Sequence, residues 1–201
     1  MEVLEINKET DLKNVVGKLK LGQVGVMLSD TVYGLSCLVG DKLAIQKIYD
    51  LKKRARSKPF LILVSDFLML KKYFSFDLKQ ENILKKYWNN DIIYPTTFIL
   101  SAKNNLSKLL GIDKKQGVAV RLPKNKFLIK IIKSLDEPIV STSCNVSGQP
   151  IINNFKEIVS LSNINLIKPD FLVKFKNIKP KRKSSQILDI RDSNNIKQIR
   201  F

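Results

Sequence analysis

Histidine is absent from this chain, and cysteine occurs only twice. The lack of histidine excludes Ser–His catalysis, imidazole acid–base chemistry and histidine metal ligands. Cys37 and Cys144 are too few for a disulfide framework, and their spacing is not that of a metal site. Any catalysis must therefore depend on position, charge and hydrogen bonds, and we expect no metal site built by the protein itself.

Long apolar runs are also missing. No stretch reaches the roughly 20 residues needed to cross a bilayer. The N-terminal segment MEVLEINKETDLKNVV carries charges throughout and lacks the apolar core of a signal peptide. The scarcity of cysteine suits a reducing compartment. We therefore expect a cytoplasmic protein that does not enter a membrane.

Acidic residues are scarce: there are 18 of them against 36 basic residues, which gives a net charge of +18. Such a charge suggests a polyanionic partner, either nucleic acid or nucleotide phosphate. The chain is also crowded with Lys, Asn and Ile, which A/T-rich genomes encode most often, and its lysines are spread over many segments. Composition alone leaves both explanations open.

The sequence does contain a regular alternation of apolar periodicities. Apolar residues at helical spacing predict helices over 10–22, 41–54, 66–88 (in one or two pieces), 125–135 and 153–162. Short apolar runs predict strands over 23–28, 60–64, 94–100, 117–122, 138–142 and 169–175, and a last hairpin over 186–190 and 196–201. We expect turns over 29–37 and a polar loop between 100 and 117. This order indicates one α/β domain over 1–201, with a mixed sheet flanked by helices.

Three of the predicted strands run into hydroxyl-rich or basic residues. They are GVML before SDTVYG (25–34), GVAV before RLP (117–123) and PIV before STSCNVSG (138–148). In open α/β sheets, ligands bind where strand ends deliver loops, so we expect the three ends to meet in one site. Each segment alone is also typical of an ordinary turn. Arg121 alone could form a surface salt bridge or a fork for carboxylate or phosphate.

A basic cluster follows the second predicted helix, with five cations in the eight residues LKKRARSK at 51–58. At a helix end, such charges complement the macrodipole or face solvent. Lys52 and Arg54 could also clamp a polyphosphate. No P-loop and no glycine-rich dinucleotide fingerprint occurs in the chain. The pattern therefore indicates an anion-binding α/β protein, which would hold a nucleotide with side chains and hydroxyl groups.

Five motifs in order resemble one family: SDTVYGL (29–35), LKKR…KPFLILV (51–64), PTTF (95–98), VAVRLP (118–123) and PIVSTSCNVSG (138–148). The chain resembles the YrdC-like threonylcarbamoyl-AMP synthases of the TsaC type, in their short form, over nearly its whole length. The resemblance implies a twisted open sheet with a concave basic groove. It also implies a nucleotidyltransferase that converts L-threonine, bicarbonate and ATP, with Mg²⁺, into L-threonylcarbamoyladenylate and pyrophosphate. The implied pathway is threonylcarbamoyladenosine modification of tRNA, so tRNA and the other proteins of that pathway are expected partners.

The resemblance assigns site residues position by position. The implied threonine-binding residues are Ser29, Thr31, Tyr33, Arg121 and Ser141. The implied ATP-binding residues are Lys52, Arg54, Arg56, Gly117, Ser143, Asn145, Ser185 and Arg200. Four of these are the implied catalytic residues: Lys52 and Arg54 would stabilise charge on the leaving pyrophosphate, and Ser143 and Asn145 would orient phosphate oxygens.

The chain departs from the family pattern in a few places. Leu28 stands where the family has Pro, and Cys144 stands where Ala is common. The family's Trp-Pro-Gly-Pro-x-Thr is reduced to IIYPTTF, which keeps Pro95 and Thr97, and Trp88 lies too far upstream to fill the Trp position without an insertion. We expect these changes to affect loop geometry more than chemistry.

Two other functions compete with the synthase. A non-catalytic protein that binds double-stranded RNA or tRNA, for example in ribosome maturation, would explain the net charge. A carbamoyl-transfer enzyme of hydrogenase maturation contains a similar domain, but its acylphosphatase-like and zinc-finger segments have no counterpart in this sequence.

Overall fold

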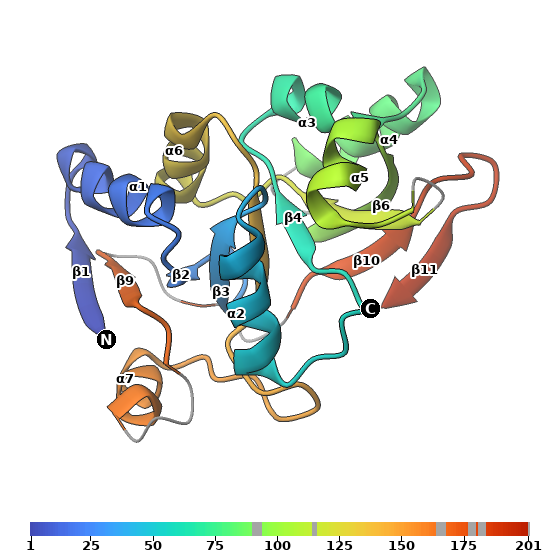
Figure 1. Ribbon diagram of the computed structural model, residues 1–201. Coiled ribbons are helices and arrows are strands. Elements are labelled where there is room, and N and C mark those ends of the chain that lie inside the picture. Colours follow the sequence, from blue (N-terminus) through green and yellow to red (C-terminus); the bar gives the residue numbers. More distant parts are fainter. Residues whose placement is uncertain (90–93, 114–115, 164–167, 177–179, 181–183, 201) are drawn as a thin grey trace.

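One mixed sheet organises the chain (Figure 1). The structure is a computed structural model that describes residues 1–89, 94–113, 116–163, 168–176, 180 and 184–200. The strand order is β1-β9-β2-β3-β8-β4-β7-β6-β10-β11, and β5 pairs with β6. Because β1 and β11 end this order in the part of the chain that is described, the sheet is open. The predicted α/β fold, a single domain with an open twisted mixed sheet and flanking helices, is confirmed, whereas the bounds 1–201 stay a prediction.

The strands are short and come from all parts of the chain. Their bounds are Glu2–Ile6 (β1), Gly25–Leu28 (β2), Tyr33–Leu38 (β3), Leu61–Leu63 (β4), Phe74–Ser75 (β5), Thr96–Ala102 (β6), Gly117–Arg121 (β7), Ile139–Ser143 (β8), Phe171–Phe175 (β9), Gln186–Asp189 (β10) and Lys197–Arg200 (β11). The helices are Leu12–Lys20 (α1), Lys42–Lys52 (α2), Phe67–Tyr73 (α3), Leu78–Trp88 (α4), Asn104–Leu110 (α5), Lys126–Leu135 (α6) and Phe155–Asn163 (α7), with a 3-10 turn at Glu9–Asp11.

Strand direction alternates irregularly across the sheet. β9 is parallel to β1 and β2, and β10 is parallel to β6. β8 is antiparallel to both of its neighbours, β3 and β4, whereas β4 is parallel to β7. It follows that β7 runs opposite to β8, although both carry predicted site residues at their C-terminal ends.

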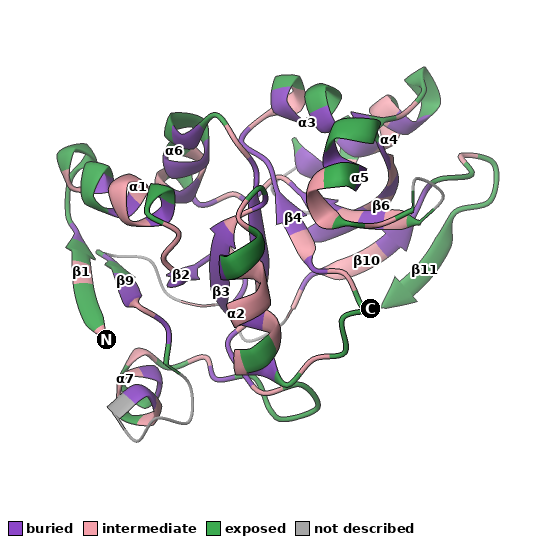
Figure 2. Cartoon of the chain, in the orientation of Figure 1, coloured by how far each residue is buried: buried purple, intermediate pink, exposed green. Residues whose placement is uncertain are grey.

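The core lies in the middle of the sheet and under the helices. Figure 2 shows the central strands buried and the outer helix faces exposed, with β11 exposed along its length. α1 and α6 lie side by side, and the apolar faces of both are buried. Asp41, Asp66, Asp77 and Asn125 cap their helices by accepting backbone N–H groups, which fixes where the helices begin.

Most predicted elements are present. The segment 66–88 forms two helices, α3 and α4, with the short strand β5 between them. The predicted C-terminal hairpin is the antiparallel pair β10–β11. No helix in the described residues is long and apolar enough to span a membrane.

Three elements differ from the sequence predictions. β3 occupies Tyr33–Leu38, where turns were expected. Gly34 and Ser36 favour turns, but the segment pairs with β2 and β8 and is buried between them. α5 replaces the expected polar loop, ends at Gly111 in a left-handed conformation and buries Leu106. β1 was not expected either, and it pairs with β9 along its whole length.

Candidate functional site

A cavity of about 240 Å³ opens over one face of the sheet. The polar residues that line it are Ser29, Thr31, Arg54, Thr97, Arg121, Ser141, Thr142, Ser143, Ser184, Ser185 and Arg200. Its apolar and glycine lining is Val32, Gly34, Pro59, Phe60, Leu61, Ala119, Ile151 and Ile187. Three arginines and no acidic residue lie among these lining residues, so the cavity suits an anion.

Most of the strand side chains in the lining alternate along their strands, although Thr142 of β8 borders the cavity as well. Ser141 and Ser143 of β8 and Ala119 and Arg121 of β7 each differ by two positions, the spacing that places side chains on one face. The three segments that were expected to share one site do line one cavity, although β7 runs opposite to β8. They meet on a face of the sheet.

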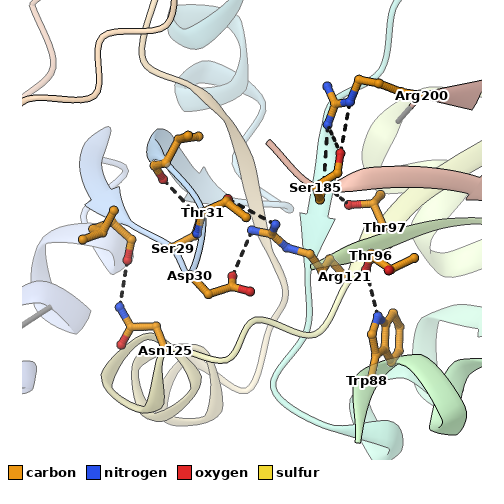
Figure 3. Close-up of polar contacts among 12 residues, drawn as sticks. Ser29, Asp30, Thr31, Trp88, Thr96, Thr97, Arg121, Asn125, Ser185 and Arg200 are labelled. Atoms are coloured by element: carbon orange, nitrogen blue, oxygen red, sulfur yellow. Dashed lines mark hydrogen bonds and ion pairs between the residues drawn. The ribbon is translucent and has the colours of Figure 1, made fainter. Parts of the chain in front are cut away.

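The turn between β2 and β3 contributes two hydroxyl groups to the cavity. The hydroxyls of Ser29 and Thr31 lie 2.8 Å apart, and Ser29 Oγ donates to the carbonyl of Val32 at 3.1 Å. Ser29 Oγ also accepts the backbone N–H of Thr31 at 3.2 Å. Asn125 Nδ2 donates to the carbonyl of Leu28 at 2.8 Å and so fastens the end of β2 (Figure 3). This segment is both a turn and part of the cavity wall.

Arg121 is the most buried cation of the cavity, with 3% of its surface exposed. Its Nη1 donates to Thr31 Oγ1 at 3.2 Å, and its Nη2 lies 3.3 Å from Asp30 Oδ1 (Figure 3). Its Nε has no hydrogen-bond partner among the described residues. Sequence reasoning missed Asp30 because it treated the motif as a source of hydroxyl groups. The position of Asp30 between Ser29 and Thr31 was the sequence signal that could have indicated a partner for Arg121.

A second cationic group closes the opposite wall. Arg200 donates from Nε and Nη2 to the carbonyl of Ser185 at 3.1 and 2.7 Å, and Ser185 Oγ lies 2.8 Å from Thr97 Oγ1 (Figure 3). Partial desolvation, together with the charge of Arg121, lowers the pKa of Arg200. Two guanidinium groups that repel each other across a cavity favour an anion between them. Thr97, which the motif kept, was not predicted as a site residue.

Arg54 reaches the cavity from the segment after α2. Its Nε donates to the carbonyl of Lys58 at 3.0 Å, and its Nη2 donates to the carbonyl of Pro59 at 3.2 Å. The guanidinium also lies over the Phe60 ring, with Cζ 5.4 Å from the ring centroid. These contacts hold the side chain against the wall and keep its charge next to the cavity.

Lys52 lies behind the wall instead of in it. The residue is 2% exposed and is absent from the lining. Its Nζ donates to the carbonyls of Ser143 and Asn145 at 2.6 and 2.8 Å, and to Asn145 Oδ1 at 2.8 Å. Of the predicted Ser-x-Asn pair, Ser143 lines the cavity, whereas Asn145 is buried beside Lys52.

Three more predicted residues lie outside the lining. Tyr33 is buried in β3, and burial raises its pKa. Arg56 is exposed on the surface. Gly117 begins β7, where an added Cβ would lie 2.4 Å from Ile99 Cγ2, so close packing explains this glycine. Among the described residues, no group of three or more Asp, Glu, Cys or His side chains could hold a metal.

Trp88 lies close to the start of β6. At the C-terminal end of α4, its Nε1 donates to the carbonyl of Thr96 at 2.9 Å (Figure 3). This bond fixes the start of β6, one residue before Thr97. Ile92 and Ile93 of the shortened motif lie outside the described residues.

Comparison with known proteins identifies the family of this chain. The profile of the family described as "Telomere recombination", which groups Sua5, YciO and YrdC proteins, matches residues 17–200. The chain therefore belongs to the Sua5/YciO/YrdC family. A threonylcarbamoyl-AMP synthase of Psychromonas ingrahamii is 34% identical over 149 residues, which cover 73% of this chain and 75% of that protein.

Solved structures share the fold. Escherichia coli YciO superposes with a TM-score of 0.79 at 21% identity, over 99% of this chain and 92% of that one. Pyrococcus abyssi Sua5 complexed with L-threonine superposes with a TM-score of 0.76 at 22% identity. That match covers 94% of this chain but only 53% of the Sua5 chain, so this chain spans about half of that protein.

Proposed function

We propose that this chain is a threonylcarbamoyl-AMP synthase, a nucleotidyltransferase that uses L-threonine, bicarbonate and ATP. The observation that carries the proposal is a small cavity with three arginines, hydroxyl groups from four segments and no acidic lining residue, in a chain of this family. A relative 34% identical over most of its length bears that name.

The cavity divides into two proposed subsites. Around Arg121, the threonine subsite uses its guanidinium for the carboxylate and the hydroxyls of Ser29, Thr31 and Ser141 for the rest of the amino acid. Tyr33 supports this subsite from β3. Because a site that hydrogen-bonds a substrate hydroxyl rejects the analogue that lacks it, 2-aminobutyrate should be a poor substrate.

The ATP subsite occupies the rest of the cavity. Arg54 and Arg200 face the phosphates, Ser143 and Ser185 offer hydroxyl groups, and Phe60 and Ile151 give apolar contact. Lys52, Asn145 and Gly117 belong to the supporting shell of this subsite, and Arg56 lies at its outer edge. Mg²⁺ would enter on the phosphate oxygens of ATP and neutralise part of their charge.

The chemistry needs no protein nucleophile. The threonine amine adds to CO₂ derived from bicarbonate, and the amine loses a proton as the carbamate forms. A carbamate oxygen then attacks the α-phosphorus of ATP in line, and pyrophosphate leaves with the bond electrons. The protein aligns two anions and offsets their charge, which its arginines and hydroxyls can do without histidine.

The test is product detection. Purified protein, threonine, bicarbonate and Mg-ATP should yield threonylcarbamoyladenylate by mass spectrometry, with pyrophosphate release that requires threonine. Arg121→Met should lower kcat/KM for threonine by about 10²-fold or more, the scale of a lost charged hydrogen-bonding group. If folded wild-type protein forms no adenylate under these conditions, the proposed function is wrong.

The pathway partners follow from the same proposal. The adenylate would pass to the other threonylcarbamoylation proteins, which would transfer its threonylcarbamoyl group to an adenosine of tRNA and release AMP, in the cytoplasm. RNA binding without catalysis stays the alternative, supported by the net charge of +18. It predicts RNA affinity that falls steeply with salt and no threonine-dependent pyrophosphate release.

A further inference from the structure

We propose that Lys52 is a positioning residue: its ammonium group holds the 143–148 loop in the shape that receives phosphate, and it does not touch the substrate. The part that concerns phosphate rests on the function proposed above. The part that concerns the loop rests on contacts within the protein. The inference changes the role that sequence resemblance gave this residue, from a cation facing ATP to a buried support.

The ammonium group of Lys52 has no free donor. It carries three N–H bonds when protonated. The structure gives it three acceptors, which are the carbonyls of Ser143 and Asn145 and the side-chain Oδ1 of Asn145, all between 2.6 and 2.8 Å. A phosphate oxygen could bind this ammonium only by displacing one of these acceptors.

The burial of Lys52 agrees with its three hydrogen bonds inside the protein. Lys52 is the last residue of α2 and is 2% exposed, and the lining of the cavity does not include it. By contrast, Arg54, two residues later, does line the cavity. The two cations of the basic motif therefore face different surroundings: one faces the ligand space and the other faces the loop.

The bonds lead from Lys52 to the cavity in two steps. Asn145 Oδ1 accepts both the Lys52 ammonium and the hydroxyl of Ser143, at 2.8 and 2.7 Å. Asn145 Nδ2 donates to the carbonyl of Gln149 at 2.6 Å, and the backbone N–H of Ser147 donates to the carbonyl of Lys52 at 2.8 Å. Lys52 thus orients Asn145, Asn145 orients the Ser143 hydroxyl, and that hydroxyl lies in the cavity wall.

The proton of Lys52 is held less firmly than that of a solvated lysine. Burial, and then the charge of Arg54, lower its pKa from 10.5 to about 8. The other group that acts on it is the Cys144 thiol, whose own pKa burial raises to about 12, and Glu157 in turn acts on Cys144. At neutral pH the ammonium donates to all three acceptors. Because an opened, solvated loop would return this pKa toward 10.5, a pH rise above about 8 does not favour opening, and the support rests on the three hydrogen bonds.

The first experiment uses the ligand-free protein. Hydrogen exchange of the peptide that spans 143–149 should be about tenfold faster or more in Lys52→Met than in wild type, since charged hydrogen bonds are lost. Lys53→Met is the matched control: it removes a neighbouring, exposed ammonium and should leave this peptide unchanged. An unchanged loop in ligand-free Lys52→Met would overturn the inference, because a lysine that only touches phosphate does not protect an empty loop.

The second experiment measures activity. In Lys52→Met, the KM for ATP should rise about tenfold or more, while the KM for threonine changes little. The split between the two KM values is the decisive readout, because the Ser143 hydroxyl is assigned to the phosphate subsite and not to the threonine subsite. A KM for ATP that is unchanged in Lys52→Met, or a KM for threonine that rises equally, would contradict the role.

The two arms separate this inference from the proposed function. If wild type makes no adenylate, the exchange arm still tests the loop, and only the proposed function fails. If wild type is active and the loop of Lys52→Met keeps its protection, only the inference fails. Should Lys52→Met not fold, exchange in Lys52→Gln, which keeps a shorter polar side chain, gives the decision: faster exchange of 143–149 supports the role, and wild-type protection excludes it.

Discussion

Arg121 is a charged side chain in nearly complete burial, and such a charge needs a partner. Among the described residues, Asp30 is the acidic side chain that pairs with it, at 3.3 Å. Arg200 lies close enough for Arg121 to lower its pKa, so two cations share the cavity with one carboxylate behind them. Asp30 therefore stabilises the empty protein, and an anionic ligand adds a second counter-charge.

Asp30→Asn tests how far the Asp30 carboxylate stabilises the buried Arg121. The amide keeps the shape but leaves Arg121 without its counter-charge, so we expect a loss of roughly 3 kcal/mol of folding free energy, or a midpoint lower by roughly 10 °C. Pyrophosphate should then raise the midpoint more in the variant than in wild type, since it supplies the missing charge. Thermal unfolding with and without millimolar pyrophosphate measures both effects.

Asp136→Asn is the control for that change. Asp136 makes an ion pair with Lys72 at 3.4 Å, but its side chain is 88% exposed, so its loss should cost less than about 0.5 kcal/mol. Asparagine also tolerates the positive φ of 51° at this position. If both variants unfold at the wild-type temperature, Asp30 is not the charge partner described here.

At the scale of elements, the sequence predicted the helices and apolar strands but not the direction of the strands. Val118 and Val120 mark β7 as buried whichever way it runs, and only the pairing with β4 shows that it opposes β8. Motif order predicted part of the cavity lining, including Arg54 and Arg121 but not Thr97, whereas the meeting of these residues on one face needed the strand pairing. β3 was not predicted because the serine, aspartate, threonine and glycine residues of 29–36 favour turns, although Tyr33, Leu35 and Cys37 alternate as in a strand.

Gly117 tests whether packing or a ligand requires a small residue at the start of β7. In Gly117→Ala, the new Cβ would lie 2.4 Å from Ile99 Cγ2 and 2.9 Å from Arg191 Cδ. We expect a loss of about 1–3 kcal/mol from overpacking, with an unchanged KM for ATP in the folded fraction. Denaturant unfolding and steady-state kinetics measure the two quantities.

Gly17→Ala is the control, because it makes the same substitution at a position where the added methyl group contacts nothing. Nothing lies within 4 Å of a Cβ at this helical position, so the variant should gain about 0.5–1 kcal/mol. Full stability of Gly117→Ala together with a raised KM for ATP would mean that the nucleotide, and not Ile99, is what excludes a side chain there.

At the scale of the whole molecule, the net charge of +18 has two separable consequences. Repulsion among 36 basic residues opposes the compact state everywhere on the surface. Three arginines at the cavity, in contrast, create one place that suits a multivalent anion. Monovalent salt screens the general repulsion among the basic residues. A small polyanion, in contrast, should act at the cavity.

Thermal unfolding can distinguish the two. Raising NaCl from about 0.01 M to about 0.15 M shortens the Debye length from about 30 Å to about 8 Å, so the midpoint of wild type should rise. Pyrophosphate at constant ionic strength should raise it further by binding the folded state. Arg54→Met should keep the response to NaCl, because one charge in 36 hardly changes the total, and should lose most of the response to pyrophosphate.

Lys133→Met completes the comparison, since it removes one positive charge from the exposed face of α6, away from the lining of the cavity. Its responses to both salts should equal those of wild type. Because Arg54→Met and Lys133→Met have the same net charge, any difference between them comes from position and not from total charge. If both variants lose the pyrophosphate response equally, the anion is held by the general field of a basic protein, and the cavity is not its site.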